Sequence, residues 1–269
     1  MDVTVVGMGN MGSAFARRAH AQGFSVYWWN RTREKVKDAP GVELKRLEEA
    51  RGLVVVFVAD DQALYSVVDK LGGEYVALAG TYSVDAVRRA VDALASRGKR
   101  AFAMPVIGSP RNVESGDAVY LVGAPEEVYM QLRPHLEKFG TLFYVGDSVK
   151  AAALKLAYNA LLISTVAALG ESLSLALKYG ISADAFRALL SHTVFKEVAA
   201  RYVDRMLGKT APTFTVRNAA KDMRYASAAA GEAGVGNVAI SGVKALYEVL
   251  TALGLGDEDY VKAGLLETK

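Results

Sequence analysis

Short apolar runs and amphipathic segments alternate along the first half of the chain. The apolar runs are rich in β-branched residues and predict strands at 3–6, 25–29, 42–45, 53–58, 75–78, 100–104, 119–122 and 142–145. Helical spacing of apolar positions predicts helices at 11–22, 32–37, 62–71 and 84–96, and another from about Pro125. Strands that are apolar throughout are typical of a parallel sheet covered on both faces. We therefore predict one doubly wound parallel sheet that includes all of these strands.

The pattern changes near Gly146. From Ser148 onward we find no convincing strand, and Ala/Leu-rich helical segments dominate, the first running from about Ser148 to Tyr179. A helix of that length is expected to run between domains or subunits. We therefore predict an α/β domain over residues 1–146, followed by an all-α domain over residues 147–269 that begins with a long interdomain helix.

Composition excludes several classes of function. Hydrophobic residues make up 52% of the chain and charged residues 23%, which is ordinary for a soluble globular protein. The formal net charge of +3 is small and no basic block is present, so no nucleic-acid partner is expected. The chain has no cysteine, and its three histidines lie on separate predicted elements, so we expect no metal site. Without a leader-like segment or a sufficiently apolar span, we expect a cytoplasmic protein with no membrane partner.

A glycine-rich turn follows the first predicted strand. Its residues, which form a G-x-G-x-x-G pattern, are Gly7, Met8, Gly9, Asn10, Met11 and Gly12. The first glycine permits a tight turn, the second allows the backbone to approach a pyrophosphate, and the third lets helix and strand pack closely. The helix that follows presents free N–H groups to the phosphates. Strand, turn, helix and second strand occur in the right order, so we predict a Rossmann-type dinucleotide-binding domain.

The residues after the second predicted strand indicate which dinucleotide is bound. An acidic residue at this place binds the adenine ribose hydroxyls of NAD, whereas this chain has Asn30, Arg31 and Thr32. Arg31 can pair with a 2′-phosphate and stack on adenine, and the two neighbouring side chains can donate hydrogen bonds. The sequence therefore favours NADP(H), with NAD as the alternative.

With these motifs in place, the chain resembles the β-hydroxyacid dehydrogenase family, which includes 3-hydroxyisobutyrate dehydrogenases and glyoxylate/succinic semialdehyde reductases. The resemblance covers nearly the whole chain. It depends on the glycine-rich turn, on residues 30–32, on the loop 105–109, on the segment from Gly146 through Lys155 to Asn159, and on the Lys221-Asp222 pair. Several motifs in the same order are far more specific than any one of them.

By this resemblance Lys155 is the catalytic residue. The chemistry agrees, because hydride reduction of a carbonyl builds charge on oxygen, and a positioned ammonium stabilises that charge and donates the proton. Asn159 lies four residues later on the same helix face, where it is expected to orient the substrate or Lys155. Placed on the long helix beside the domain boundary, both are expected to line an interdomain cleft.

The resemblance and the strand ends supply further candidates. Val58, Ala59 and Asp60 end a predicted strand at the edge where open α/β sheets bind ligands, although Asp60 would equally cap the next helix. Thr81 matches a family position near the nicotinamide, and Lys221 matches a lysine that reaches both cofactor and substrate. The expected substrate-binding residues are Ile107, Gly108, Ser109, Lys155, Asn159 and Lys221.

Three positions depart from the family pattern. Gly80 replaces a serine, Ala103 an acidic residue, and Ile107 the serine that helps hold a substrate carboxylate. The N–H groups of Gly108 and Ser109 would still offer donors to an anion. The loop 107–110 also resembles that of imine reductases, relatives that generally lack the catalytic lysine. Because of Ile107, the sequence leaves the physiological substrate open.

These inferences combine into an NADP-dependent oxidoreductase. Its substrate is expected to be a small aldehyde, keto acid or β-hydroxyacid, with Lys155 as general acid and base. An imine reductase of the same fold is one alternative, and a non-catalytic NADP-binding module is another. The apolar faces of the second domain suggest a homodimer or homotetramer.

Overall fold

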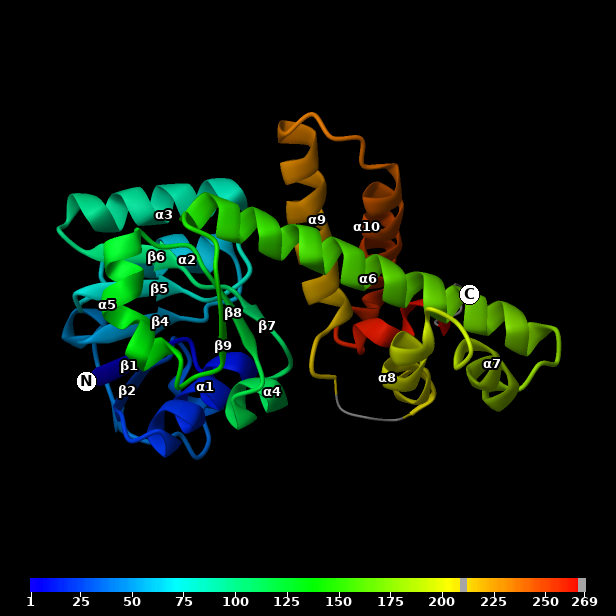
Figure 1. Cartoon of the computed structure of the whole chain (residues 1–269), viewed down its shortest axis with the longest axis horizontal. Coiled ribbons are helices and arrows are strands. Elements are labelled where there is room, and N and C mark those ends of the chain that lie inside the picture. Colours follow the sequence, from blue (N-terminus) through cyan, green and yellow to red (C-terminus); the bar gives the residue numbers. More distant parts are fainter. Residues whose placement is uncertain (209–211, 266–269) are drawn as a thin grey trace. The chain divides into compact units, whose positions relative to one another are not determined.

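The computed structural model describes residues 1–208 and 212–265 and divides into two compact units (Figure 1). The first unit comprises Met1–Lys155 and the second Leu156–Lys269. The division falls inside one long helix, α6 (Ser148–Lys178), which begins in the first unit and continues into the second.

A six-stranded parallel sheet forms the centre of the first unit, in the order β3-β2-β1-β4-β5-β6. The strands are β1 (Asp2–Val6), β2 (Ser25–Trp29), β3 (Val42–Glu43), β4 (Leu53–Val56), β5 (Tyr75–Leu78) and β6 (Arg100–Ala103). This is the strand order of Rossmann-type sheets, in which ligands bind at the carboxyl ends where the order reverses, here between β1 and β4. The predicted doubly wound parallel sheet is confirmed.

Helices cover both faces of this sheet, and each face has its own core (Figure 1). The helices of the first unit are α1 (Asn10–Ala21), α2 (Asp61–Val68), α3 (Val84–Ser96), α4 (Pro110–Ser115) and α5 (Glu126–Leu136). Successive strand residues alternate between faces, so Val5 packs with α1, α4 and α5, whereas Val6 packs with α2 and α3. Both faces are apolar, which explains the continuous apolar runs in the sequence.

Two local predictions are wrong. The strands predicted at 119–122 and 142–145 do not extend the main sheet; they are β8 (Val119–Val122) and β9 (Thr141–Tyr144) of a separate three-stranded sheet that begins with β7 (Val106–Ile107). The chain turns after β6, so β7 pairs antiparallel with β8, and a single bridge joins Ala103 to Gly123. The helix predicted at 32–37 is only a 3-10 turn, Arg33–Lys35, because few of its side chains find an apolar surface to cover.

The described residues of the second unit form helices joined by loops, with one isolated β-bridge between Thr215 and Asp259. After α6 come α7 (Ala183–Leu190), α8 (Lys196–Leu207), α9 (Val216–Glu232) and α10 (Val238–Leu250), and α9 and α10 lie side by side (Figure 1). In the described part of the chain, two helices, α6 and Val238–Leu255, are long and apolar enough to cross a membrane by length and composition alone, whereas the sequence analysis expected no sufficiently apolar span. Core helices of water-soluble proteins meet the same criterion, so this finding does not place the chain in a membrane.

Candidate active site

The glycine-rich turn joins β1 to α1, and its three glycines meet different surroundings. Gly7 has a φ of +95°, which favours glycine, and a Cβ on Gly12 would lie 1.9 Å from the Gly7 carbonyl oxygen. A Cβ on Gly9 would meet nothing within 4 Å. The first and third glycines are therefore needed for the fold itself, whereas the second leaves open space in front of the backbone.

The start of α1 differs from the starts of α2, α3 and α4. Those three helices are capped by side chains, since Asp60, Ser83 and Ser109 accept hydrogen bonds from Ala63, Ala86 and Asn112 N–H groups. In the described structure no side chain caps α1, whose N-cap is Gly9. Its first N–H groups are thus left to a ligand, and the open space at Gly9 fits a pyrophosphate.

Asn30 connects this turn to the segment after β2. Its Oδ1 accepts a hydrogen bond from the Met8 N–H at 2.9 Å, and its Nδ2 donates to the Thr32 carbonyl at 2.7 Å. Asn30 therefore holds the two halves of the predicted dinucleotide site together. Arg31 is exposed, and it lines a surface groove together with Trp29.

Residues in the segment after β4 cap a helix and accept a hydrogen bond from a buried tyrosine. The Asp60 carboxylate caps α2 by accepting from Ala63 at 2.8 Å, as the alternative interpretation of this residue anticipated. The Val58 carbonyl accepts from the Tyr82 hydroxyl at 3.2 Å, and Ala59 is exposed. Val58, Ala59 and Asp60 follow β4 at the switch point, so their backbone borders the place where a dinucleotide binds.

The loop after β5 explains the absence of the family serine at position 80. A Cβ on Gly80 would lie 2.5 Å from the Tyr82 ring, which is only 2% exposed and turns back beneath the loop. Any larger residue at position 80 would displace this ring. Thr81, between the two, is half-buried at the carboxyl end of β5.

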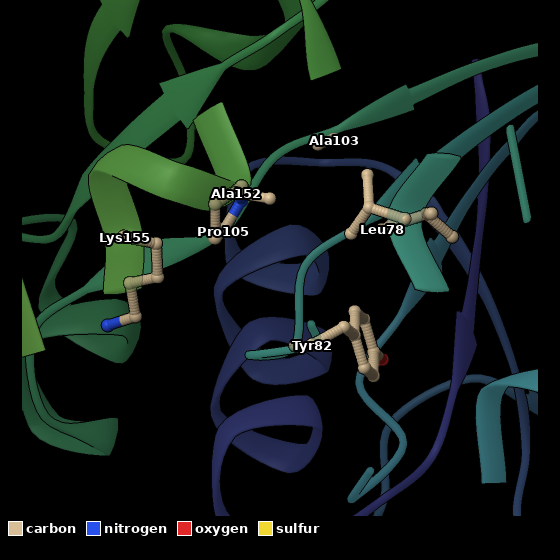
Figure 2. Close-up of a pocket in the computed structure, with 8 residues that line it drawn as sticks. Leu78, Tyr82, Ala103, Pro105, Ala152 and Lys155 are labelled. Carbon is tan, nitrogen blue, oxygen red and sulfur yellow. The ribbon is translucent and has the colours of Figure 1, made fainter. Parts of the chain in front are cut away.

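Lys155 borders a small cavity in the first unit. Figure 2 shows Lys155 and Ala152 projecting from α6, with Leu78 and Tyr82 contributed by β5 and the loop that follows it. The Lys155 side chain is 8% exposed, and its Nζ donates to the Val106 carbonyl oxygen at 2.7 Å. The structure thus brings Lys155 to the backbone of β7, directly beside the predicted substrate loop.

Lys155 is the one charged side chain among the eight residues that line this cavity, all of them in the described part of the chain. Tyr82 is the other lining residue with an ionisable group. Burial, together with Asp61 and Asp60, raises the pKa of Tyr82 far above its ordinary value, and its hydroxyl already donates to backbone carbonyls. Tyr82 therefore holds its proton firmly near neutral pH.

The predicted anion-binding loop is braced by its own side chains. Ser109 and Asn112 form a capping box at the start of α4, in which the Ser109 N–H donates to Asn112 Oδ1 at 3.0 Å. An anion at this N–H would have to displace the Asn112 side chain. Gly108 has a φ of +143° and is exposed, and Ile107 is half-buried on β7.

Within the second unit, Asn159 and Lys221 both contact the carboxylate of Asp222. Asn159 Nδ2 donates to Asp222 Oδ2 at 2.6 Å, and Lys221 Nζ lies 3.0 Å from Asp222 Oδ1. The exposed fractions of Asn159 and Asp222 are 6% and 1%. The two predicted residues are therefore joined by a buried polar network, which holds their side chains in one arrangement.

Asp222 was absent from the site residues predicted from sequence, although it belongs to the motif that carried the resemblance. A signal was present in the pattern. Asp222 lies between Ala219 and Ala226 on the buried face of α9. A buried carboxylate destabilises the folded state unless it is paired. A charged residue on an apolar helix face thus indicated a buried partner, but the sequence did not say which residue that partner was.

We expect Asp222→Ala to lower the free energy of unfolding by about 3–5 kcal/mol, because it removes the buried carboxylate that pairs with Lys221 and accepts the Asn159 hydrogen bond. Urea unfolding measures the change. The control is Asp204→Ala on α8, whose side chain is 70% exposed and paired with Arg187; its cost should be about 0–1 kcal/mol. Equal costs for the two variants would contradict the buried network.

Comparisons with known proteins identify the family of the chain. Residues 2–146 match the family model described as the NAD binding domain of 6-phosphogluconate dehydrogenase. Residues 150–264 match the model described as NAD-binding of NADP-dependent 3-hydroxyisobutyrate dehydrogenase. Among curated proteins, glyoxylate/succinic semialdehyde reductase 1 of Arabidopsis thaliana is 26% identical over 97% of this chain and 96% of its own length.

Solved structures show the same fold. The 3-hydroxyisobutyrate dehydrogenase of Mycobacterium tuberculosis, solved with L-serine, has a TM-score of 0.83 at 20% identity and is matched over 98% of both chains. A reductive aminase from Aspergillus terreus, in complex with NADPH and ethyl levulinate, has a TM-score of 0.64 at 22% identity over 97% of both chains. With the two family models in consecutive order along its length, this chain belongs to the β-hydroxyacid dehydrogenase family of NAD(P)-dependent dehydrogenases and reductases.

Proposed function

We propose that this protein is an NADP-dependent reductase of small aldehydes or keto acids, and that Lys155 donates the proton to the carbonyl oxygen. The observation that carries the proposal is the position of Lys155, the one charged residue among the described residues that line its cavity, with its Nζ 2.7 Å from the Val106 carbonyl oxygen. In such surroundings an ammonium is a stronger electrostatic partner for a developing alkoxide than it would be in water.

The reaction balances with a single proton from the protein. When bound, the nicotinamide supplies a hydride to the carbonyl carbon. Lys155 gives one proton to the oxygen, becomes a neutral amine, and regains a proton from solvent before the next turnover. An ammonium has three N–H donors, and the Val106 carbonyl takes one of them, which fixes the direction of the side chain. In the reverse direction the neutral amine accepts the hydroxyl proton.

The NADP preference has support in the residues after β2. Asn30 is engaged with the glycine-rich turn, and no carboxylate stands at the end of β2 to repel a 2′-phosphate. The exposed Arg31 guanidinium is suited to bidentate pairing with that phosphate. The name of the Arabidopsis relative suggests glyoxylate and succinic semialdehyde as substrates, both small aldehydes with a carboxylate.

A substrate panel tests the proposal. NADPH oxidation is followed with glyoxylate, succinic semialdehyde, methylmalonate semialdehyde and a cyclic imine, each with NADH in parallel. We expect turnover with at least one of the aldehydes, and a higher kcat/KM for NADPH than for NADH. Turnover of none of the aldehydes would overturn the reductase proposal, and a preference for NADH would overturn the NADP assignment.

A second candidate is reduction of C=N bonds. Ile107 places an apolar side chain where carboxylate-binding relatives carry serine, and the likeness to a reductive aminase extends over nearly the whole chain. An imine substrate carries its own basic nitrogen and depends less on a donor such as Lys155. Faster turnover of the cyclic imine than of every aldehyde in the panel would favour this candidate.

A further inference from the structure

A groove of about 500 Å³ lies in the first unit beside the predicted 2′-phosphate residues. Its walls include Arg31, Lys45, Arg46 and Lys70, with Glu48 as the one acidic residue among those that line it, all within the described chain. Trp29 also lines it and is half-buried, so the groove combines an apolar surface with four cations. The volume is within the range of small-molecule sites.

The sheet register explains why these cations meet. β2 and β3 are parallel neighbours in which Tyr27 pairs with Val42 and Trp28 with Glu43, and the Leu44 N–H donates to the Trp28 carbonyl at 2.8 Å. Adjacent strands lie about 4.8 Å apart. Lys45 and Arg46, which follow β3, therefore leave the sheet at the same edge as Arg31, which follows β2.

Lys70 reaches the groove from a different direction. It follows α2, a helix that starts after the carboxyl end of β4 and returns toward the amino ends of the strands. Lys70 is thus expected to lie farther from Arg31 along the groove than the two cations after β3.

The positive charge of the groove is only partly neutralised. Arg46 pairs with Glu49 at 3.3 Å, but the Arg46 side chain is 72% exposed and such surface pairs are weak. Glu48 is exposed and supplies one negative charge against four positive ones. A phosphate monoester carries between about −1.5 and −2 charges at pH 7, so it would gain from this excess.

We propose that this groove holds the phosphorylated adenosine end of NADP, and that Lys45 and Arg46 act with Arg31 as specificity-determining residues for the 2′-phosphate. The inference rests on the proposed NADP preference and adds two residues that the dinucleotide motif does not contain. Lys70 contributes less, because it follows α2 and is expected to lie farther from Arg31 along the groove.

The test compares binding of NADPH with NADH, and of 2′,5′-ADP with 5′-ADP, by calorimetric titration of the whole chain. The variant is Lys45→Gln/Arg46→Gln, which removes both charges and keeps most of each side-chain stem. We expect affinity for NADPH and 2′,5′-ADP to fall about tenfold or more, while affinity for NADH and 5′-ADP changes less than about twofold. Lys70→Gln is expected to weaken NADPH binding by less than about threefold.

The matched control is Arg88→Gln/Arg89→Gln on α3. These arginines lie outside the groove, pair with Asp85 at 3.7 and 2.8 Å, and have exposed side-chain fractions of 55% and 70%. Removing them changes the net charge by the same amount and should leave all four affinities unchanged.

The outcomes separate the two proposals. If the unsubstituted protein does not prefer NADPH, the NADP assignment fails and the groove inference fails with it. If it prefers NADPH but the Lys45/Arg46 variant keeps that preference, the groove inference alone is overturned. Equal losses in the α3 control would show a general charge effect and would also overturn it. A preference for NADPH that falls as salt rises from 0.05 to about 1 M would support it, since the Debye length shortens to about 3 Å.

Discussion

Replacing Lys155 with alanine is expected to lower kcat by a factor of about 10²–10⁴ while the Kd for NADPH stays within about twofold. The large effect follows because Lys155 is the one charged group among the described residues that line its cavity. The nearby Tyr82 hydroxyl holds its proton and donates to backbone carbonyls. Cofactor affinity should persist because the glycine-rich turn and the start of α1 do not depend on this side chain. Steady-state kinetics and NADPH titration measure the two effects.

Two further variants make the result specific. Lys155→Arg keeps a positive charge but cannot release a proton near neutral pH, so it should remain at least about tenfold slower than the unsubstituted enzyme. Lys150→Ala removes an exposed lysine from the same helix, with a side-chain exposure of 71%, and should leave kcat unchanged. Full activity of Lys155→Ala would mean that another group supplies the proton.

Alanine at Gly12 and alanine at Gly9 are expected to damage different properties. The new Cβ at Gly12 would lie 1.9 Å from the Gly7 carbonyl oxygen, so α1 must separate from β1, at a cost of about 3–5 kcal/mol in the free energy of unfolding. The Cβ at Gly9 meets nothing within 4 Å, and this variant should lose no more than about 1 kcal/mol. Urea unfolding of the two variants provides the comparison.

For NADPH affinity, in contrast to stability, Gly9 is the glycine whose substitution is informative. Gly9→Ala should fold normally but bind NADPH at least about tenfold more weakly, because its methyl group occupies the space through which a pyrophosphate approaches the backbone. If Gly9→Ala binds NADPH as tightly as the unsubstituted protein, the dinucleotide does not cross the turn at this residue. A fully stable Gly12→Ala would contradict the close packing of α1 on β1.

The hydrophobic pattern of the sequence was enough to predict the main sheet. Its central strands are apolar on both faces, and the glycine-rich turn follows the first of them in the chain. The pattern was not enough for β8 and β9, since an apolar run does not tell which sheet it joins. That choice depends on the turn after β6, which reverses the chain at Val106 and pairs β7 antiparallel with β8. The 3-10 turn at Arg33–Lys35 also depended on packing, because propensity alone favours a helix there.

The candidate site shows the same limit. Motif spacing predicted Lys155 and Asn159, but the partner of Asn159 lies 63 residues away, and only the folded chain identifies it as Asp222. Lys45 and Arg46 read as ordinary surface charges in the sequence, and the pairing of β3 with β2 is what brings them beside Arg31. Residues that act through long-range contacts are thus the ones that the sequence left unassigned.

The most direct test of hydride transfer by this protein follows the hydride itself. NADPH that carries deuterium at the transferable position of C4 is incubated with the protein and the aldehyde panel, and the products are analysed by mass spectrometry. We expect an alcohol with one deuterium on the former carbonyl carbon, formed at least about a hundredfold more slowly by Lys155→Ala. Tight binding of NADPH with no deuterium in any product would contradict aldehyde reduction by this protein.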